Sequence, residues 1–265
     1  MPVSLGIRNE RSIAQTLRET RLIMGMPVCI EIVDDRADRA SALAETFAYF
    51  TAVDEQFSTY KATSEISRFN RGELSETGLS PAMREVFALA DDTKRASDGY
   101  FDMRRPDGST DPSGIVKGWA IRNAAHLLDE CGFQNFYVEA GGDIQTRGTN
   151  AERQPWAIGI RNPFNASEIV KVVYPNGKGI ATSGTSMRGQ HIYNPHAPGA
   201  LLTEMASLTI IGPDVFEADR YATAAFAMGV PGLGFIENLA GFEGYAVLAD
   251  GNACFTSGFA RYVAH

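Results

Sequence analysis

The amino-acid sequence predicts an α+β fold whose sheet is largely antiparallel. Segments with the two-residue periodicity of strands are interleaved with segments of helical periodicity, but not as a regular strand–helix alternation. Strand-like runs also follow each other directly near the end of the chain, at residues 245–249 and 253–257, as antiparallel pairing allows. No linker-like or low-complexity segment divides the chain, so residues 1–265 are expected to form a single domain.

Composition limits both the size and the partners of the protein. A chain of 265 residues with 44% hydrophobic and 21% charged residues is globular, and is long enough for one large domain or two interlocked ones. Its formal net charge of −8 argues against binding to bulk nucleic acid or to an anionic membrane, although a local basic pocket is compatible with it. We therefore expect neither nucleic acid nor membrane among the partners.

The cysteines and the N-terminal segment predict a reducing compartment. Cys29, Cys131 and Cys254 are far apart, odd in number and without metal-ligand spacing, which favours buried, reduced thiols. Residues 1–21 carry charges throughout and lack the apolar core of a signal peptide. The sequence thus predicts a cytoplasmic protein without a membrane span.

The first third of the chain alternates helical patterns with one strand. The apolar residues of its longest pattern recur mostly three or four positions apart, as on an amphipathic helix. Ser80-Pro81 is a strong helix start, because serine caps a helix and proline is favoured at its first position. The predicted elements are a helix at residues 12–22, a strand at 28–33, a helix at 36–57, a polar loop at 58–70 and a helix at 81–97.

Tyr60 stands at the start of the polar loop. It can stack on a planar ligand, or it can pack at the end of the preceding helix with its hydroxyl in water. Further along, Tyr100-Phe101-Asp102 is expected to be a short extended piece after the helix break at Asp98-Gly99.

The stretch from Asp111 to Trp119 predicts a turn that enters a helix over residues 111–131. The start of a helix offers free N–H groups and a partial positive charge, and Lys117 adds a full charge in the same region. Asp111 fits beside an anion if a metal ion is also present. The stretch is therefore either a phosphate-plus-metal site or an ordinary capped helix start with a solvated lysine.

The rest of the chain is rich in strand patterns. Gly141-Gly142-Asp143 is a tight turn, which either lets a ligand approach the backbone or closes a plain hairpin. Residues 181–186, rich in hydroxyls and backbone donors, are a plausible phosphate or ribose cradle. The predicted strands are residues 135–139, 156–161, 169–174, 179–183, 207–211, 245–249, 253–257 and 259–263, with helices at 212–228 and 233–239.

Asp219 and Thr223 are four residues apart on the second-last predicted helix. Both oxygens then project from one helix face and can hold a hard cation such as Mg²⁺. Alternatively, the aspartate faces solvent and the threonine bonds back to its own helix. His191 precedes Ile-Tyr-Asn-Pro, a loop pattern, and is either a surface histidine or a functional one.

Taken together, these stretches resemble the FAD:protein FMN transferase family, also called the ApbE family. The matching pieces occur in the family's order and span most of the chain. They are Met24-Gly25; Ser58-Thr59-Tyr60 with the run from Ser64 to Asn70; Gly99-Tyr100-Phe101-Asp102; Asp111 to Ala120; Gly141-Gly142-Asp143; Ala181-Thr182-Ser183-Gly184; His191-Ile192-Tyr193-Asn194-Pro195; and Glu217 to Thr223.

The resemblance implies tandem α/β units with mixed, largely antiparallel sheets, forming two interlocked subdomains with FAD in the cleft between them. It implies a Mg²⁺-dependent reaction in which a Thr or Ser hydroxyl of an acceptor flavoprotein takes FMN from FAD and AMP leaves. Some members instead hydrolyse FAD to FMN and AMP. The resemblance places FAD on Met24, Tyr60, Tyr100, Phe101, Asp102, Asp111, Lys117 and Ile192; it places Mg²⁺ on Asp219, Thr223 and a backbone oxygen near Gly114; and His191 matches the histidine often regarded as catalytic.

These assignments agree with the chemistry of the residues. Displacement at a pyrophosphate requires neutralisation of the phosphoryl oxygens, which Mg²⁺ and Lys117 can provide. We therefore expect Lys117 and His191 to be catalytic, with His191 acting as base toward the acceptor hydroxyl or as acid toward AMP.

The sequence departs from the family pattern at three places. A short turn separates Asp102 from Asp111, where many members have a longer insertion, as in a compact form of the family. Arg122 stands where the family often has an acidic residue, and Asn194 replaces the aspartate of a His-x-x-Asp-Pro pattern, so Asn194 is not expected to be catalytic.

Two further functions stay open from the sequence. An FAD pyrophosphatase would use the same site with water as the nucleophile. A non-catalytic flavin-binding protein belongs to a different class, and the Asp219/Thr223 pair argues against it because storage needs no metal site. For a transferase, the predicted location implies a cytoplasmic acceptor with a Thr or Ser target.

Overall fold

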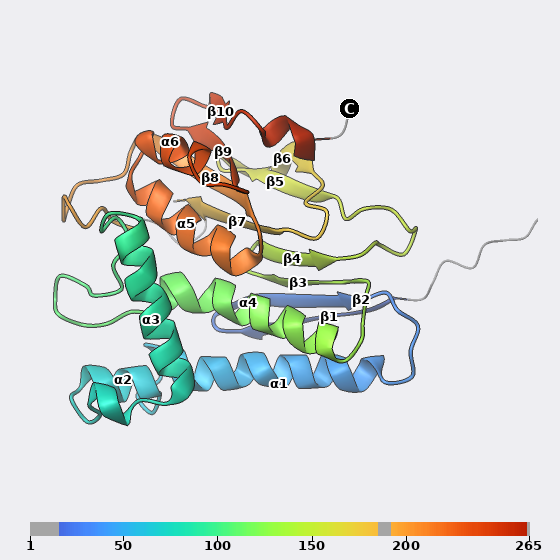
Figure 1. The fold of residues 1–265 in the computed structure, drawn as a ribbon, viewed down its shortest axis with the longest axis horizontal. Coiled ribbons are helices and arrows are strands. Elements are labelled where there is room, and N and C mark those ends of the chain that lie inside the picture. The colour runs from blue at the N-terminus through green and yellow to red at the C-terminus, as the bar shows by residue number, and fades with distance from the viewer. Residues whose placement is uncertain (1–15, 185–191, 264–265) are drawn as a thin grey trace, which may run out of the picture.

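One continuous antiparallel sheet organises the chain (Figure 1). Its eight strands run in the order β1-β2-β3-β4-β7-β8-β9-β10, and β5 and β6 form a separate two-stranded sheet. The structure, a computed structural model, describes residues 16–184 and 192–263. All pairings between its named strands are antiparallel, so the predicted α+β class is confirmed.

The element bounds follow the sequence patterns closely in the helices and less closely in the strands. The strands are β1 (Leu17–Ile23), β2 (Met26–Ile32), β3 (Phe136–Ala140), β4 (Asp143–Arg147), β5 (Ile158–Asn162), β6 (Asn165–Val173), β7 (Gly179–Gly184), β8 (Met205–Gly212), β9 (Glu243–Leu248) and β10 (Ala253–Phe255). The helices are α1 (Arg39–Phe57), α2 (Glu65–Asn70), α3 (Pro81–Ala96), α4 (Ser113–Glu130), α5 (Val215–Ala227) and α6 (Pro231–Glu237), with short 3₁₀ helices η1 (Glu76–Gly78) and η2 (Phe259–Tyr262).

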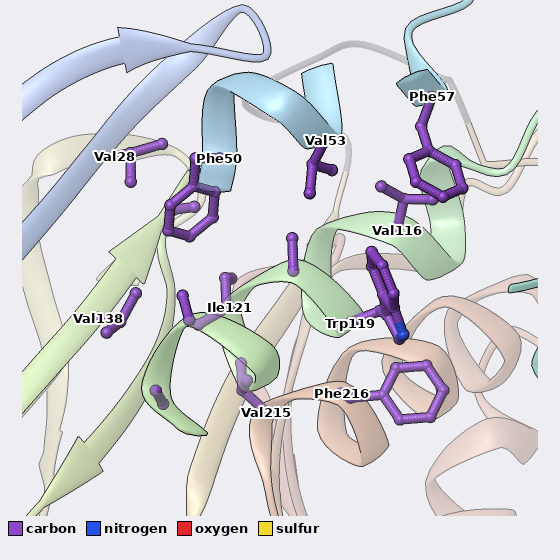
Figure 2. Close-up of a cluster of buried hydrophobic side chains, with 14 of the residues drawn as sticks. Val28, Phe50, Val53, Phe57, Val116, Trp119, Ile121, Val138, Val215 and Phe216 are labelled. Carbon is purple, nitrogen blue, oxygen red and sulfur yellow. The ribbon is translucent and has the colours of Figure 1, made fainter. Parts of the chain in front are cut away.

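Helices cover one face of the sheet. α4 packs on β3 and β4, α5 packs on β7 and β8, and α1 lies against α4 and the first two strands. In the core between α1 and α4, Phe50 and Val53 of α1 face Ile121 of α4 (Figure 2). The Trp119 ring lies 5.5 Å from that of Phe57. This core sets the position of α4, which carries the predicted anion site at its start.

Strand β8 is buried along its whole length because both of its faces are covered. α5 packs on one face, and the β5–β6 hairpin and η2 contribute to a second core on the other. That second core includes Ile160, Val173, Ile211 and Phe259. A strand covered on both faces is buried at consecutive positions, so its two polar residues, Ser207 and Thr209, are buried together with the apolar ones.

The predicted helix at residues 12–22 is wrong where the structure describes it, because residues 17–23 form β1. Met24 and Gly25 have φ values of 56° and 70° and form a two-residue turn between Ile23 and its partner Met26. Such a turn, with both central residues at positive φ, matches the twist of a hairpin. β1 then pairs with β2 from Leu17 to Ile23, and this pairing outweighs the weak helical pattern.

Gly141 and Gly142 close another hairpin, joining β3 to β4. Both glycines have positive φ, and Ala140 pairs with Asp143 across the turn. The hairpin interpretation of this turn is confirmed. The sequence does not predict strand β4, because its residues are mostly polar and show no alternation of apolar and polar side chains.

Two other loop and strand predictions need correction. The second half of the loop predicted at residues 58–70 is helix α2, capped by Ser64, whose side chain accepts a hydrogen bond from the Ser67 N–H. The strand predicted at residues 259–263 is instead the 3₁₀ helix η2. A 3₁₀ helix repeats every three residues, so Phe259 and Tyr262 both reach the second core.

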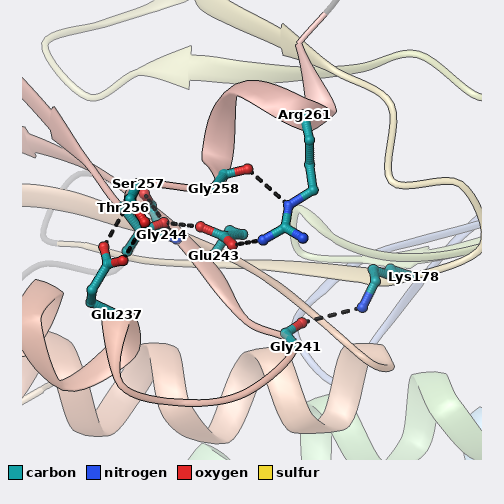
Figure 3. A network of polar contacts seen from close by, with 9 residues as sticks. All are labelled: Lys178, Glu237, Gly241, Glu243, Gly244, Thr256, Ser257, Gly258 and Arg261. Atoms are coloured by element: carbon teal, nitrogen blue, oxygen red, sulfur yellow. Dashed lines mark hydrogen bonds and ion pairs between the residues drawn. The ribbon is translucent and has the colours of Figure 1, made fainter.

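Polar contacts fix η2 and the start of β9 (Figure 3). The buried Glu243 carboxylate accepts hydrogen bonds from Thr256 Oγ1 and from Arg261. Thr256 Oγ1 also accepts from the Gly244 N–H at 2.9 Å, and Arg261 Nε donates to the Gly258 carbonyl at 2.9 Å. These bonds end the last strand and turn the chain into η2.

The three cysteines are free thiols, as predicted. Cys29 is buried, but Cys131 and Cys254 are exposed, so the predicted burial is wrong for these two. Cys131 follows the last turn of α4, and Cys254 lies on the edge strand β10. In the described part of the chain, no helix combines the length and apolar character needed to cross a membrane.

Close packing of α4 on α5 depends on Gly118. A Cβ atom at this position would lie 2.7 Å from Asp219 Cβ and 3.0 Å from the Phe216 Cα. We expect Gly118→Ala to lower the free energy of unfolding by about 1–3 kcal/mol through overpacking. Urea unfolding measures this loss. Gly234→Ala in α6 is the matched control, because no atom beyond its chain neighbours and its own helix backbone lies within 4 Å of its Cβ position. Equal effects of the two variants would contradict the packing described.

Candidate active site

A lysine between two carboxylates forms the centre of the site. The Lys117 Nζ lies 2.8 Å from Asp219 Oδ1 and forms an ion pair with Asp143 Oδ2. The other Asp219 oxygen accepts a hydrogen bond from the Gly118 N–H at 2.9 Å, and Asp143 Oδ1 accepts one from the Thr182 N–H at 3.0 Å. Three elements, α4, α5 and the start of β4, therefore meet at Lys117.

The charge balance of this centre favours an added cation. Asp143 and Asp219 are 1% and 4% exposed, and among the described residues the ion pairs of both go to one group, the Lys117 ammonium. Two carboxylates and one ammonium leave one negative charge in a largely desolvated place, which is costly without further compensation. A divalent cation would complement it.

Thr223 and Gly114 lie beside this centre. Thr223 is one turn beyond Asp219 on α5, and a Cβ atom on Gly114 would lie 3.7 Å from its methyl carbon. The same Cβ would lie 2.9 Å from Phe101 Cε2, so glycine lets the Phe101 ring pack closely against the start of α4. Carboxylate, hydroxyl and backbone oxygens are the ligands that Mg²⁺ prefers, and this donor set fits the ion.

The predicted metal ligands are one carboxylate, one hydroxyl and one backbone oxygen, and not a cluster of acidic and imidazole side chains. Within residues 16–184 and 192–263, no group of three or more His, Cys, Asp or Glu side chains could hold a metal ion. Asp219 is the only member of the predicted set with such a side chain. Its two oxygens already have protein partners, which orient the carboxylate and leave further lone pairs for a ligand.

The lysine centre opens into a cavity of about 630 Å³. This volume lies in the usual range for cofactor sites. Residues 182–184, part of the predicted hydroxyl-rich cradle, also line it, whereas residues 185 and 186 lie outside the described residues. The predicted site residues in its wall are Tyr100, Phe101, Asp102, Asp111, Gly114, Lys117, Ile192, Asp219 and Thr223.

Two predicted site residues, Met24 and Tyr60, are not in the cavity wall, and the position of a third is not described. Met24 occupies the β1–β2 turn and packs partly against the main core, while its neighbours Gly25 and Met26 do line the cavity. Tyr60 is 98% exposed in the turn after α1. His191 lies outside the described residues. Their roles stay predictions.

Asp102 and Asp111 enter the cavity already paired with cations. Asp102 Oδ2 lies 2.6 Å from Lys94 Nζ, and Asp111 forms an ion pair with Arg105. Asp111 Oδ1 also accepts a hydrogen bond from the Ser113 N–H at 3.0 Å, next to the first turn of α4. Its carboxylate thus stabilises the turn that leads into α4, whose lysine faces the cavity.

Asp143 and Tyr193 are site residues that the sequence reasoning missed. The sequence identifies Gly141-Gly142-Asp143 as a tight turn, open to a ligand or closing a hairpin, and as a stretch that matches the family. The signal for a site residue was the carboxylate directly after two glycines. Tyr193 lines the cavity and donates a hydrogen bond to the Arg104 carbonyl at 3.1 Å. Burial, together with the nearby charge of Asp102, raises the pKa of Tyr193, so it is a neutral donor at physiological pH.

The two substituted family positions have structural roles. The Arg122 guanidinium stacks over the Phe216 ring at 4.4 Å and lies 3.8 Å from Glu85, away from the cavity wall. Asn194 Oδ1 accepts a hydrogen bond from the His196 N–H at 2.9 Å. The His196 ring packs on Tyr100 with ring centroids 4.5 Å apart. Asn194 therefore shapes the loop that supports a cavity residue.

Solved structures show which known fold the chain shares. The chain superposes on the flavin transferase ApbE from Vibrio cholerae with a TM-score of 0.84 at 24% identity, covering 94% of this chain and 100% of that one. It superposes on the ApbE protein from Thermotoga maritima with a TM-score of 0.83 at 20% identity, covering 95% and 100%. The chain therefore has the fold of these ApbE structures.

Sequence comparison gives the family. The ApbE family model matches residues 24–105 and 103–246, and the chain belongs to the ApbE family. The FAD:protein FMN transferase of Vibrio cholerae is 26% identical over 279 residues, covering 79% of this chain and 84% of that protein. The enzyme of the same name from Haemophilus influenzae is 25% identical over 290 residues, covering 82% and 84%. The family predicted from the motifs is confirmed.

Proposed function

We propose that the protein is a Mg²⁺-dependent transferase that moves FMN from FAD to a Thr or Ser of an acceptor protein and releases AMP. The observation that carries the proposal is the cavity floor, where Lys117 lies between Asp143 and Asp219 next to Thr223. A non-catalytic flavin carrier has no need for a cation and two desolvated carboxylates at this place. The relatives named FAD:protein FMN transferase support the same reaction class.

FAD is the proposed occupant of the cavity. It would lie in the cleft between the half of the chain that contains α4 and the half that contains α5. Its pyrophosphate would face Lys117, whose charge neutralises phosphoryl oxygens. Phe101 and Ile192 supply apolar contacts in the wall, and the paired carboxylates of Asp102 and Asp111 can accept hydrogen bonds from ribityl or ribose hydroxyls. Met24 and Tyr60 are further FAD contacts predicted from sequence.

Mg²⁺ would be held by Asp219, Thr223 and the Gly114 backbone. It would supply charge neutralisation on the pyrophosphate in addition to that from Lys117. Asp143 keeps Lys117 oriented toward the cavity floor, because its carboxylate is fixed by the Thr182 N–H. Asp143 is thus a positioning residue for the proposed reaction.

The reaction is an exchange of phosphorus–oxygen bonds. The acceptor oxygen forms a bond to the FMN phosphorus, and the anhydride bond to AMP breaks, with the electron pair leaving on the AMP phosphate. The acceptor hydroxyl loses its proton to a base, for which His191 is the candidate predicted from sequence. Water in place of the acceptor would give FMN and AMP. The cytoplasmic location of the protein, and of its acceptor, stays a prediction.

The proposal is tested with the protein, FAD and Mg²⁺, with and without a candidate acceptor protein. In-gel flavin fluorescence after denaturation detects covalent FMN, and chromatography detects AMP and free FMN. We expect a fluorescent acceptor band together with AMP. Equal amounts of AMP and free FMN without a band would instead establish the pyrophosphatase. Tight FAD binding without AMP would exclude both enzymes.

A further inference from the structure

One edge of strand β5 faces the cavity without a partner strand. Within the part of the chain that the structure describes, β5 pairs with β6 and no other strand. Every residue from Ile158 to Asn162 lines the cavity. Side chains alternate between the two faces of a strand, so a cavity beside one face would contact only every second residue. A cavity that contacts consecutive residues therefore lies along the backbone edge of the strand.

One face of the β5–β6 hairpin is anchored in the second core, and exposed apolar side chains lie on the rest of the hairpin. Ile160 is 3% exposed and packs in the second core. On the opposite face, a Cβ atom on Gly159 would lie 2.8 Å from Ile169 Cδ1, so the Ile169 side chain covers this glycine. Ile169 is nevertheless 48% exposed, and Phe164, which lines the cavity at the hairpin tip, is 60% exposed. Open strand edges with apolar neighbours are normally shielded unless they bind something.

We propose that the open edge of β5 binds an extended segment of the acceptor polypeptide by strand addition, with Phe164 and Ile169 contacting its apolar side chains. This inference rests on the proposed transferase function. A Thr or Ser side chain is short, so the acceptor main chain must enter the cavity for its hydroxyl to approach a phosphate near Lys117. Main-chain groups that leave water need partners, and the β5 edge in the same cavity supplies them.

Backbone-modified peptides test this mode of binding. Short synthetic peptides with a central threonine and randomised flanks are incubated with the full chain, FAD and Mg²⁺, and the labelled sequences are identified by mass spectrometry. The best substrate is then remade with a single N-methyl group at each position in turn. Only every second amide of an added strand points toward its partner. We expect labelling to fall about tenfold or more at alternate positions and to stay within about twofold at those between.

Variants of the hairpin test the same idea from the protein side. We expect Phe164→Ser and Ile169→Ser each to raise KM for the best peptide about tenfold, with kcat and FAD affinity unchanged, because an apolar contact is lost. Leu22→Ser is the matched control, since Leu22 is 79% exposed on the edge strand β1 and does not line the cavity.

Each contrary outcome has a distinct meaning. Equal loss at every N-methylated position, or weaker FAD binding in the hairpin variants, would overturn strand addition. Labelling of native acceptor proteins, or AMP release, without labelling of any peptide would also overturn it and leave the proposed transferase or hydrolase activity intact. Absence of both AMP and label would remove the proposed function together with the inference.

Discussion

Replacement of Asp219 by alanine is expected to abolish Mg²⁺-dependent turnover while leaving the fold intact. The loss should be about 10²–10³-fold or more, as for removal of a group that stabilises developing charge. The fold is retained because Lys117 keeps its ion pair with Asp143, so no buried carboxylate loses its counterion. Initial rates of AMP release at increasing Mg²⁺, together with near-ultraviolet circular dichroism, measure the two effects.

Asp92→Ala is the matched control for this variant. Asp92 is also a helical aspartate, but it is exposed on α3 and pairs only with Arg95 among the ion pairs of the described residues. Exposed pairs of this kind contribute about 0–1 kcal/mol. Its turnover should equal that of the wild type. Wild-type rates in Asp219→Ala would disprove the assignment of Asp219 to the metal.

Replacement of Lys117 by methionine is expected to cost both stability and activity. It leaves Asp143 and Asp219, 1% and 4% exposed, facing one another without the cation between them. Removing one partner of a buried ion pair costs about 3–5 kcal/mol, because the remaining charge is uncompensated. Urea unfolding at neutral pH measures the loss, and AMP release should fall to background.

A second substitution separates the two effects of the lysine. In Lys117→Met/Asp143→Asn, one of the two facing carboxylates is neutral, so we expect part of the lost stability to return. Turnover should remain absent, because the positive charge on the phosphoryl oxygens is still missing. Unchanged stability of Lys117→Met would show that the ammonium does not compensate these carboxylates.

The sequence predicted the helices well because their signals are local. The apolar spacing at residues 36–57 and the Ser80-Pro81 start need no knowledge of the tertiary fold, and α1 and α3 follow them closely. The prediction for β1 was wrong for the opposite reason, because its structure does not follow from a local signal. β1 is an edge strand with mostly exposed side chains, so its structure comes from pairing with β2 and not from its own pattern.

The candidate site was predictable in its residue types but not in its geometry. The spacing of Asp219 and Thr223 placed both on one helix face, and α5 confirms that spacing. The position of Lys117 between Asp219 and Asp143 depends on how closely α4 approaches α5, which Gly118 permits. Nothing local in the sequence encodes that approach, and Asp143 was therefore missed.

The most direct test of the proposed transferase combines the amount and the position of the transferred flavin. Purified protein, FAD, Mg²⁺ and an acceptor are allowed to react to completion. AMP is quantified by chromatography, and the acceptor is digested and mapped by mass spectrometry. The proposed function predicts one FMN phosphoester on a Thr or Ser for each AMP released, with neither product formed by Asp219→Ala. AMP balanced by free FMN, with an unmodified acceptor, would contradict it.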